Sequence, residues 1–333
     1  MFSDIYARLL RDIIAQNNQP LGLDKKYNLY NDCPKGLSST GGFSYLIQRA
    51  YEENPNSDIG ITFGKQITPA HACEFSSMVT TAPTVERFIH LLISQYHRLG
   101  LKPYPVFFID QKSACIALTY PYSSKFYSSN AHQSKRRFNR FCSESFYAYV
   151  VNVIRDLVDR DFSPSYMALD YSDPGYSDKY KYFFCSPIEF ESGLSLLKFD
   201  RSILAKPLRY SNEQLHRVYL EKFSENWQAG EKRNQSYRYR AVTEMMLHAP
   251  NCFQIGKLAE RLSISIRGLQ KRLKNENSSF SELTMQVRRE LLKICLVKSD
   301  MSLEDSADLL GFQTLSSFKR FFRECMENTE TTT

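Results

Sequence analysis

The chain has 333 residues, a formal net charge of +7 and 42% hydrophobic residues. That length can hold two domains, each with its own core, and that hydrophobic content excludes a disordered chain. No uncharged apolar run reaches the roughly 18 residues of a membrane-spanning helix. Residues 1–8 carry an acid and a base and lack a signal-peptide core, so we expect a cytoplasmic protein that does not bind membranes.

The cysteine pattern and the absence of catalytic motifs restrict the classes of function that fit the chain. None of the cysteines forms a Cys-x-x-Cys pair or lies near a histidine at metal-ligand spacing. We therefore expect buried thiols in a reducing compartment, with no metal site and no cofactor. The chain also lacks a glycine-rich phosphate loop, a His-Glu-x-x-His segment and a Gly-x-Ser-x-Gly segment. These absences predict a protein that is not an enzyme.

The first two-thirds of the chain mix helical and extended patterns without a regular βαβ rhythm. Apolar residues at helical spacing predict helices at 3–16, 43–51, 85–99 and 141–158. Apolar runs predict strands at 105–109, 114–120, 165–171 and 187–199, the last broken at 191–193. We therefore predict an α+β domain at 1–210, in which helices accompany a mainly antiparallel sheet.

Two clusters in this domain allow more than one interpretation. An aromatic cluster can line a pocket for an apolar effector, although such residues more often belong to the core or to a subunit interface. It consists of Tyr176, Tyr180, Tyr182, Phe183 and Phe184. A basic cluster can hold an anionic effector or touch DNA phosphate, although a solvated helix start is commoner. It consists of Lys135, Arg136, Arg137 and Arg140. Neither cluster identifies the effector-binding residues.

A connection follows the first domain. Segment 213–227 has apolar residues at helical spacing, whereas 228–236 is polar and charged and contains Gly230. We therefore predict a connecting helix and linker at 211–236, and a second domain at 237–333.

The C-terminal third contains one pattern twice. Residues 255–262 predict a short helix, 263–265 a tight turn and 266–273 a second amphipathic helix, and 303–322 repeat this order. A helix-turn-helix unit needs a small residue in its first helix, then a turn residue that tolerates positive φ, then an apolar residue. These places are taken by Ala259, Ser263 and Ile264 in the first unit and by Ala307, Gly311 and Phe312 in the second. Serine suits the turn less well than glycine. The pattern predicts an all-α domain with two helix-turn-helix units.

The second helix of each unit has a buried stripe and a basic outward side. The stripes are Leu269 with Leu273 and Phe318 with Phe322, and Ser265 and Thr314 are the predicted N-caps. One basic helix alone is commonly a solvated face, but two similar units favour DNA. Arginine and lysine suit guanine edges and glutamine suits adenine. The candidate DNA-binding residues are Ser265, Arg267, Gln270, Lys271, Lys274, Ser316, Ser317, Lys319 and Arg320.

A third amphipathic segment lies between the two units. Its apolar stripe consists of Phe280, Leu283, Val287, Leu291 and Ile294. We predict a connecting helix at about 280–298, which at about 1.5 Å per residue spans roughly 28 Å. That length suits two recognition helices placed about one DNA turn, roughly 34 Å, apart.

The C-terminal third resembles the DNA-binding domain of the AraC/XylS family of bacterial transcription regulators. The resemblance is carried by Leu258-Ala259, Ser265-x-Arg267-x-Leu269-Gln270-Lys271-Arg272-Leu273, Phe280, Val287-Arg288-Arg289-Glu290-Leu291, Leu310-Gly311-Phe312 and Ser317-Phe318-Lys319-Arg320-Phe321-Phe322. It implies a bundle of about seven helices with two helix-turn-helix units. It also implies base-reading positions at Arg267, Gln270 and Lys271, and at Ser316, Ser317, Lys319 and Arg320.

The segment from about Asp58 to Leu208 is similar to the arabinose-binding-type N-terminal domain of one branch of this family. The similarity is carried by Ala82-Pro83-Thr84-Val85, Ser186-Pro187-Ile188-x-Phe190 and Leu197-x-Phe199-Asp200-x-x-x-Leu204-x-x-Pro207-Leu208. The name of that domain is not evidence that this chain binds arabinose.

Three departures from the family pattern bear on DNA binding. Gly268 lies inside the first recognition helix, where glycine either loosens the helix or lets its backbone approach DNA closely. Ser306 replaces an apolar residue, and the family's closing Ser-Pro-x-x-x-Arg segment is missing. From the missing closing segment we expect the last helix to fray and the second unit to hold DNA less firmly than the first.

These observations predict a sequence-specific transcription regulator that binds double-stranded DNA at two adjacent major-groove segments. The resemblance implies a homodimer that activates transcription by recruiting RNA polymerase. It also implies that the N-terminal domain, residues 1–210, binds a small-molecule effector, forms the dimer, or does both. One alternative is a small-molecule-binding module with a weakened DNA domain. A second alternative is an N-terminal enzyme fused to a DNA-binding tail.

Overall fold

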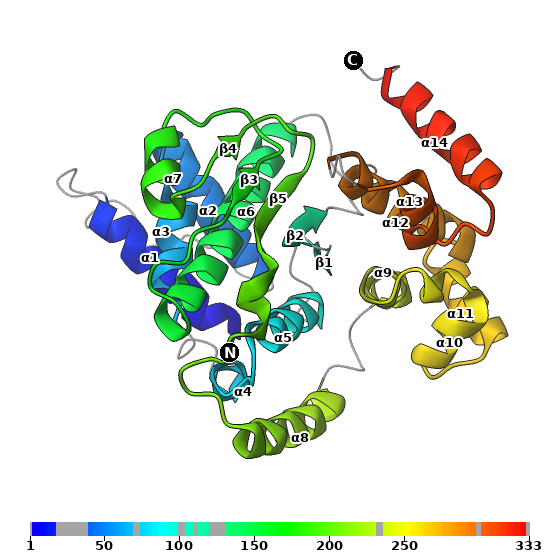
Figure 1. Cartoon of the computed structure of the whole chain (residues 1–333), viewed down its shortest axis with the longest axis horizontal. Coiled ribbons are helices and arrows are strands. Elements are labelled where there is room, and N and C mark those ends of the chain that lie inside the picture. The colour runs from blue at the N-terminus through cyan, green and yellow to red at the C-terminus, as the bar shows by residue number, and fades with distance from the viewer. Residues whose placement is uncertain are drawn as a thin grey trace.

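The computed structural model describes residues 2–17, 39–68, 74–98, 104–109, 112–119, 131–230, 236–297 and 301–330 (Figure 1). Within them, the N-terminal part contains a five-stranded sheet in the order β1-β2-β5-β3-β4. Its strands are β1 Tyr104–Ile109, β2 Ser113–Thr119, β3 Tyr166–Ala168, β4 Ile188–Glu189 and β5 Ser195–Asp200. Neighbouring strands pair antiparallel, except that β3 and β4 run parallel. The predicted α+β class with a mainly antiparallel sheet is confirmed.

The sheet is buried on both faces. In β2, Ile116 and Leu118 belong to a hydrophobic cluster that includes residues of helices α5 (Val85–Arg98) and α6 (Ala131–Leu157). Ala117, which lies between them, belongs to a second cluster formed largely by the C-terminal helices. Successive side chains of a strand point to opposite faces, so a single strand contributes to two cores.

Helix α6 is the centre of the N-terminal part. Helix α3 (Ile59–Gln66) packs closely against it because Gly60 and Gly64 bring no side chain to the contact. A Cβ atom added to Gly64 would lie 2.7 Å from the Cβ of Ala148, which is too close for two carbon atoms. The other helices of this part are α1 Phe2–Asn17, α2 Ser39–Glu53, α4 Glu74–Thr80, α7 Ser177–Phe184 and the 3₁₀ helix Arg201–Ala205.

One predicted strand was too long, whereas the break predicted within another is confirmed. The segment predicted at 165–171 is a strand only at 166–168, and the chain then leaves the sheet where the Asp170 amide binds the Ser195 hydroxyl at 3.2 Å. The segment predicted at 187–199 forms two strands, since Glu191 and Gly193 both adopt positive φ. Positive φ interrupts an extended backbone.

The predicted helices differ mainly in their bounds. The helix expected at 141–158 begins at Ala131, and the helices expected at 3–16, 43–51 and 85–99 are α1, α2 and α5. Helices α3, α4 and α7 were not predicted. The aromatic sequence of α7 is typical of strands, but Tyr180, Phe183 and Phe184 bury one helical face, and this packing overrides local preference.

The C-terminal part is entirely helical in its described residues. Its elements are α8 Glu213–Gly230, α9 Tyr237–Leu247, the 3₁₀ helix Asn251–Phe253, α10 Ile255–Arg261, α11 Ile266–Asn275, α12 Phe280–Val297, α13 Leu303–Leu309 and α14 Leu315–Glu330. Helix α8 extends into the predicted linker, of which residues 231–235 lie outside the described residues. In α12, the predicted stripe is buried at Leu283, Val287, Leu291 and Ile294.

The C-terminal helices cover the second face of the sheet. Helix α9 contacts β1 and α12 contacts β2, on the side of the sheet that faces these helices in Figure 1. The ring centroids of Tyr104 and Tyr239 lie 5.8 Å apart, and Ala117 and Ala168 are fully buried. The sheet and the C-terminal helices therefore share one hydrophobic core.

The described helices were compared with the length and hydropathy of a membrane span. Across the described ranges, no helix is both long and apolar enough to cross a membrane.

Cys115, Cys142 and Cys252 are buried as predicted. Cys185 is exposed, so the prediction was wrong there, because this residue ends α7 at the surface in the left-handed conformation. Cys33 and Cys73 lie outside the described residues.

Candidate functional site

The first helix-turn-helix unit joins α10 to α11 through a tight turn. The Ser263 amide donates to the Glu260 carbonyl at 2.9 Å, and the Ile264 amide donates to the Ala259 carbonyl at 3.0 Å. Ser263 has a φ of 56°, so it adopts the positive φ that the motif requires despite its side chain. Ala259 is buried, and its small side chain lets the two helices lie close together.

The second unit repeats this hydrogen-bond pattern between α13 and α14. The Gly311 amide donates to the Asp308 carbonyl at 3.0 Å, and the Phe312 amide donates to the Ala307 carbonyl at 2.9 Å. Gly311 has a φ of 66°. A Cβ atom at this position would lie 2.8 Å from the Phe253 ring, so glycine satisfies both the conformation and the contact.

The start of α11 is capped as predicted. The Ser265 hydroxyl accepts a hydrogen bond from the Gly268 amide at 3.1 Å. Gly268 therefore lies in the first turn of the helix, where the cap holds it, and α11 continues to Asn275. The second departure is also accommodated, because the buried hydroxyl of Ser306 donates to the Ser302 carbonyl at 2.8 Å.

The predicted DNA-binding residues lie on α11, on its cap and on α14. All of them are exposed except Ser317, which is half-buried. The cations among them have no carboxylate partner in the described part of the chain, and these are Arg267, Lys271, Lys274, Lys319 and Arg320. Unpaired surface cations are available to phosphates and to base edges.

Ser317 has a structural role at the start of α14. Its hydroxyl donates to the Thr314 carbonyl at 2.8 Å, and its amide donates to the Thr314 hydroxyl at 3.3 Å. The predicted N-cap at Thr314 is confirmed. Ser316, Lys319 and Arg320 are the more exposed candidates on this helix.

Arg288 on α12 holds the second turn, a role that the sequence did not reveal. Its Nε atom donates to the Leu310 carbonyl at 2.8 Å, and its Nη2 atom donates to the Gly311 carbonyl at 3.0 Å. Its guanidinium carbon lies 5.1 Å from the ring centroid of Phe253. Burial lowers the pKa of Arg288. The only sequence signal is an arginine beside the buried stripe of an amphipathic helix, and its partners lie on a distant turn.

Glu276 ties the end of α11 to the start of α9. Its carboxylate accepts hydrogen bonds from the backbone amides of Tyr237 and Arg238, both at 2.8 Å. A carboxylate at a helix N-terminus is also stabilised by the helix dipole. The guanidinium of Arg272 lies 4.2 Å from the Tyr237 ring centroid. The first recognition helix is thus attached to the helix that contacts the sheet.

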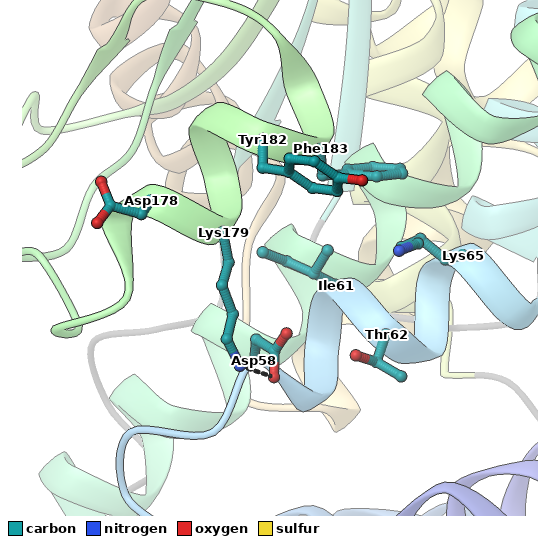
Figure 2. A pocket seen from close by; sticks show the side chains of 8 residues that line it. All are labelled: Asp58, Ile61, Thr62, Lys65, Asp178, Lys179, Tyr182 and Phe183. Atoms are coloured by element: carbon teal, nitrogen blue, oxygen red, sulfur yellow. Dashed lines mark ion pairs between the residues drawn. The ribbon is translucent and has the colours of Figure 1, made fainter.

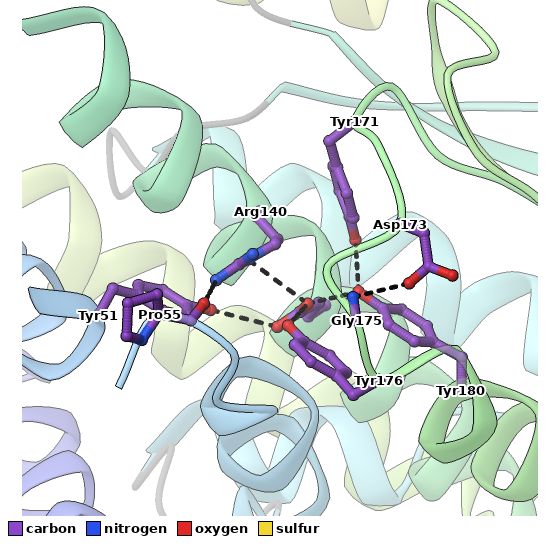
Figure 3. Close-up of polar contacts among 9 residues, drawn as sticks. Tyr51, Pro55, Arg140, Tyr171, Asp173, Gly175, Tyr176 and Tyr180 are labelled. Atoms are coloured by element: carbon purple, nitrogen blue, oxygen red, sulfur yellow. Dashed lines mark hydrogen bonds and ion pairs between the residues drawn. The ribbon is translucent and has the colours of Figure 1, made fainter. Parts of the chain in front are cut away.

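The N-terminal part contains a buried carboxylate, that of Glu144 on α6. Figure 3 shows four side chains that surround it, those of Tyr51, Arg140, Tyr176 and Tyr180. The Glu144 carboxylate accepts hydrogen bonds from the hydroxyls of Tyr176 at 2.5 Å, Tyr51 at 3.3 Å and Tyr180. Arg140 places its Nε atom 3.9 Å from the same carboxylate. Burial raises the pKa of Glu144 to about 7, while Arg140 and the hydroxyls act in the opposite direction. This network joins α2, α6 and the start of α7.

The structure corrects the interpretation of the basic cluster. Arg140 is not part of a solvated helix start, because its Nη2 atom donates to the Pro55 carbonyl at 2.9 Å. Its guanidinium lies 4.3 Å from the ring centroid of Tyr51. The attraction between Arg140 and the buried Glu144 draws this side chain inward, whereas Arg136 is exposed.

The aromatic cluster divides into core and surface. Tyr176, Tyr180, Phe183 and Phe184 are buried, as the core interpretation expects. Tyr182 is 85% exposed and lies at the edge of a pocket. Within the described residues, no group of three histidine, cysteine or acidic side chains is placed to hold a metal ion.

Two capped helices that present exposed cations without carboxylate partners are typical of a DNA-binding protein. Comparison with protein families identifies the class of this protein. A helix-turn-helix domain family matches residues 258–332, and the family described as the arabinose-binding domain of AraC transcription regulator matches residues 31–208. The chain is a DNA-binding transcription regulator controlled by its N-terminal domain. It belongs to the family of AraC-type regulators with an arabinose-binding-type N-terminal domain.

No curated protein matches the chain. The solved structure of transcriptional regulator CdpR from Pseudomonas aeruginosa matches over 95% of this chain and 93% of that chain, with 18% sequence identity and a TM-score of 0.47.

Proposed function

We propose that α11 and α14 read two neighbouring major-groove segments of one operator. The observation that carries this proposal is the repeated turn geometry, which presents two capped helices with exposed, unpaired cations. Helix α12 connects the two units, and its 18 residues span about 27 Å, close to one DNA turn. The proposed readers are Ser265, Arg267, Gln270, Lys271, Lys274, Ser316, Ser317, Lys319 and Arg320.

We further propose a division of labour along the chain. Residues 1–210 bind a small-molecule effector, residues 211–236 connect the two domains, and residues 237–333 bind DNA. An effector acts by its different affinity for two states of the protein. The core shared by the sheet and α9, together with the link from α9 to Glu276, supports a mechanical path from effector to recognition helix.

The partners of this regulator follow from the same proposal. It acts as a cytoplasmic homodimer that activates transcription by recruiting RNA polymerase, and it has no catalytic activity of its own. Leu215 and Val218 on α8 support dimerisation, since they are 47% and 55% exposed and lie three residues apart on one helix face.

The test is a selection of genomic DNA fragments by the full-length protein, followed by affinity measurements against salt. We expect a site with two base-specific patches about one DNA turn apart. The affinity should fall with rising salt as the contacted phosphates release their counterions. Weak binding that does not depend on the DNA sequence, with or without candidate effectors, would contradict the proposal and favour a weakened DNA domain.

A further inference from the structure

A small pocket lies between α3 and α7 in the N-terminal part (Figure 2). Its volume is about 350 Å³, within the range of small-molecule sites. It is lined by Asp58, Ile61, Thr62, Lys65, Asp178, Lys179, Tyr182 and Phe183. The two helices that form it also meet the Glu144 network, through Gly60 on α3 and Tyr180 on α7.

The pocket is lined by two buried apolar side chains and one exposed aromatic ring. Ile61 and Phe183 are almost fully buried, and Arg155 fixes the end of α7 by donating to the Phe183 carbonyl at 2.7 Å. Figure 2 shows the rings of Tyr182 and Phe183 on the opposite side of the pocket from Ile61. Tyr182 is 85% exposed, so its ring is free to cover a bound molecule.

The charges of the pocket leave one cation uncompensated. Lys179 pairs with Asp58 at 2.8 Å, and Asp178 lies 3.7 Å from Lys181. Among the described residues, Lys65 has no carboxylate partner. Its Nζ atom lies 5.2 Å from the ring centroid of Phe183, beside the apolar surface. A cation next to an aromatic wall suits an anion that carries an apolar group.

We propose that this pocket binds a small carboxylate with one aromatic ring or a short aliphatic chain. The carboxylate pairs with the Lys65 ammonium, and the apolar group lies between Ile61 and the rings of Tyr182 and Phe183. This proposal rests on the proposed function, for which it names the chemical class of the effector.

The pocket is connected to the DNA-binding helices by packed elements. Helix α7 is joined to α6 through Tyr176, Tyr180 and Glu144. Helix α6 is joined to β2, because the Tyr147 hydroxyl donates to the Ile116 carbonyl at 3.2 Å. The opposite face of β2 contacts α12. A ligand that holds α7 against α3 therefore acts on the first element of a continuous path to the C-terminal helices.

The test uses the full-length protein with benzoate, phenylacetate and hexanoate as probes. Benzyl alcohol serves as the neutral counterpart, and L-arabinose as a sugar. Calorimetry and thermal unfolding would measure binding to the parent, to Lys65→Met, to Lys65→Arg and to Lys222→Met. Lys222 provides the control, since it is an exposed lysine of α8 that does not line the pocket.

We expect at least one carboxylate to bind at least about tenfold more tightly than benzyl alcohol and arabinose. Lys65→Met should weaken carboxylate binding about tenfold or more, since it removes a charged partner, while Lys65→Arg and Lys222→Met retain it. Equal binding by Lys65→Met, stronger binding of the neutral probes, or no binding of the carboxylates at millimolar concentration would overturn the proposal. The selection of DNA fragments is scored separately without probes, so failure of the pocket is distinct from failure of the DNA-binding function.

Discussion

The guanidinium of Arg288 lies 4.2 Å from the ring centroid of Phe312, the apolar residue that follows the second turn. This contact and the two hydrogen bonds of Arg288 to turn carbonyls attach the second unit to α12. The first unit is attached elsewhere, because Arg261 on α10 donates to Glu244 on α9 at 2.7 Å. Since α9 and α12 pack against each other, these two arginines help to set the relative placement of the recognition helices.

Replacement of Arg288 by alanine should therefore destabilise the C-terminal part. The variant loses two charge-assisted hydrogen bonds and leaves carbonyl groups without their donor, a loss of about 2–3 kcal/mol in the free energy of unfolding. Denaturant unfolding of the full chain measures this change. Arg323→Ala is the control, an exposed arginine of α14 for which we expect a change within about 0.5 kcal/mol. Equal stability of both variants would show that Arg288 does not hold the turn.

The two turn positions should respond in opposite directions to exchange of their residues. Ser263→Gly removes the strain of a side chain at positive φ and should stabilise the chain by about 0.5–1 kcal/mol. Gly311→Ala adds this strain and a clash with the Phe253 ring, and should destabilise by more than about 1 kcal/mol. Thermal unfolding of both variants checks the pair. A stable Gly311→Ala variant would be incompatible with the observed contact.

DNA affinity should depend on one cation from each recognition helix. Arg267→Ala and Lys319→Ala should each weaken binding to the selected operator by about 1–3 kcal/mol if they contact bases, with less effect on unrelated DNA. Fluorescence anisotropy at a fixed salt concentration measures this. Arg217→Ala on α8 is the control, since Arg217 is exposed and lies outside both helix-turn-helix units. Parental affinity in both reader variants would refute the assignment.

Glu144 should make the stability of the N-terminal part depend on pH. Its pKa of about 7 lies above its ordinary value, so the folded state binds the proton more tightly than the unfolded state. The buried carboxyl therefore favours folding at low pH, and this advantage is lost as the pH rises from about 4.5 through 7. Glu144→Gln cannot titrate. We expect the melting temperature of the parent to fall relative to this variant between pH 5 and pH 8. A constant difference would show that the carboxyl ionises normally.

The DNA-binding units could be predicted because their signals are local. A helix-turn-helix unit is defined by small, turn and apolar residues at short spacing, and the predicted caps at Ser265 and Thr314 are present. The apolar stripe of α12 could be predicted for the same reason, since the spacing of its apolar residues indicates which side of the helix is buried. Strand bounds were less accurate, because pairing depends on neighbouring strands that lie far along the chain.

The buried network and the pocket required the folded chain. Tyr51 and Glu144 are separated by 93 residues, and no local pattern brings a hydroxyl of α2 to a carboxylate of α6. Arg140 follows three basic residues in the sequence, yet it turns inward because the buried carboxylate attracts it. In the same way, the continuous apolar run of β2 indicates that both faces are buried, but the packing of α9 and α12 decides what covers the second face. Local spacing specifies the DNA-reading units, whereas long-range burial of charge and apolar surface determines how the N-terminal part is built and joined to them.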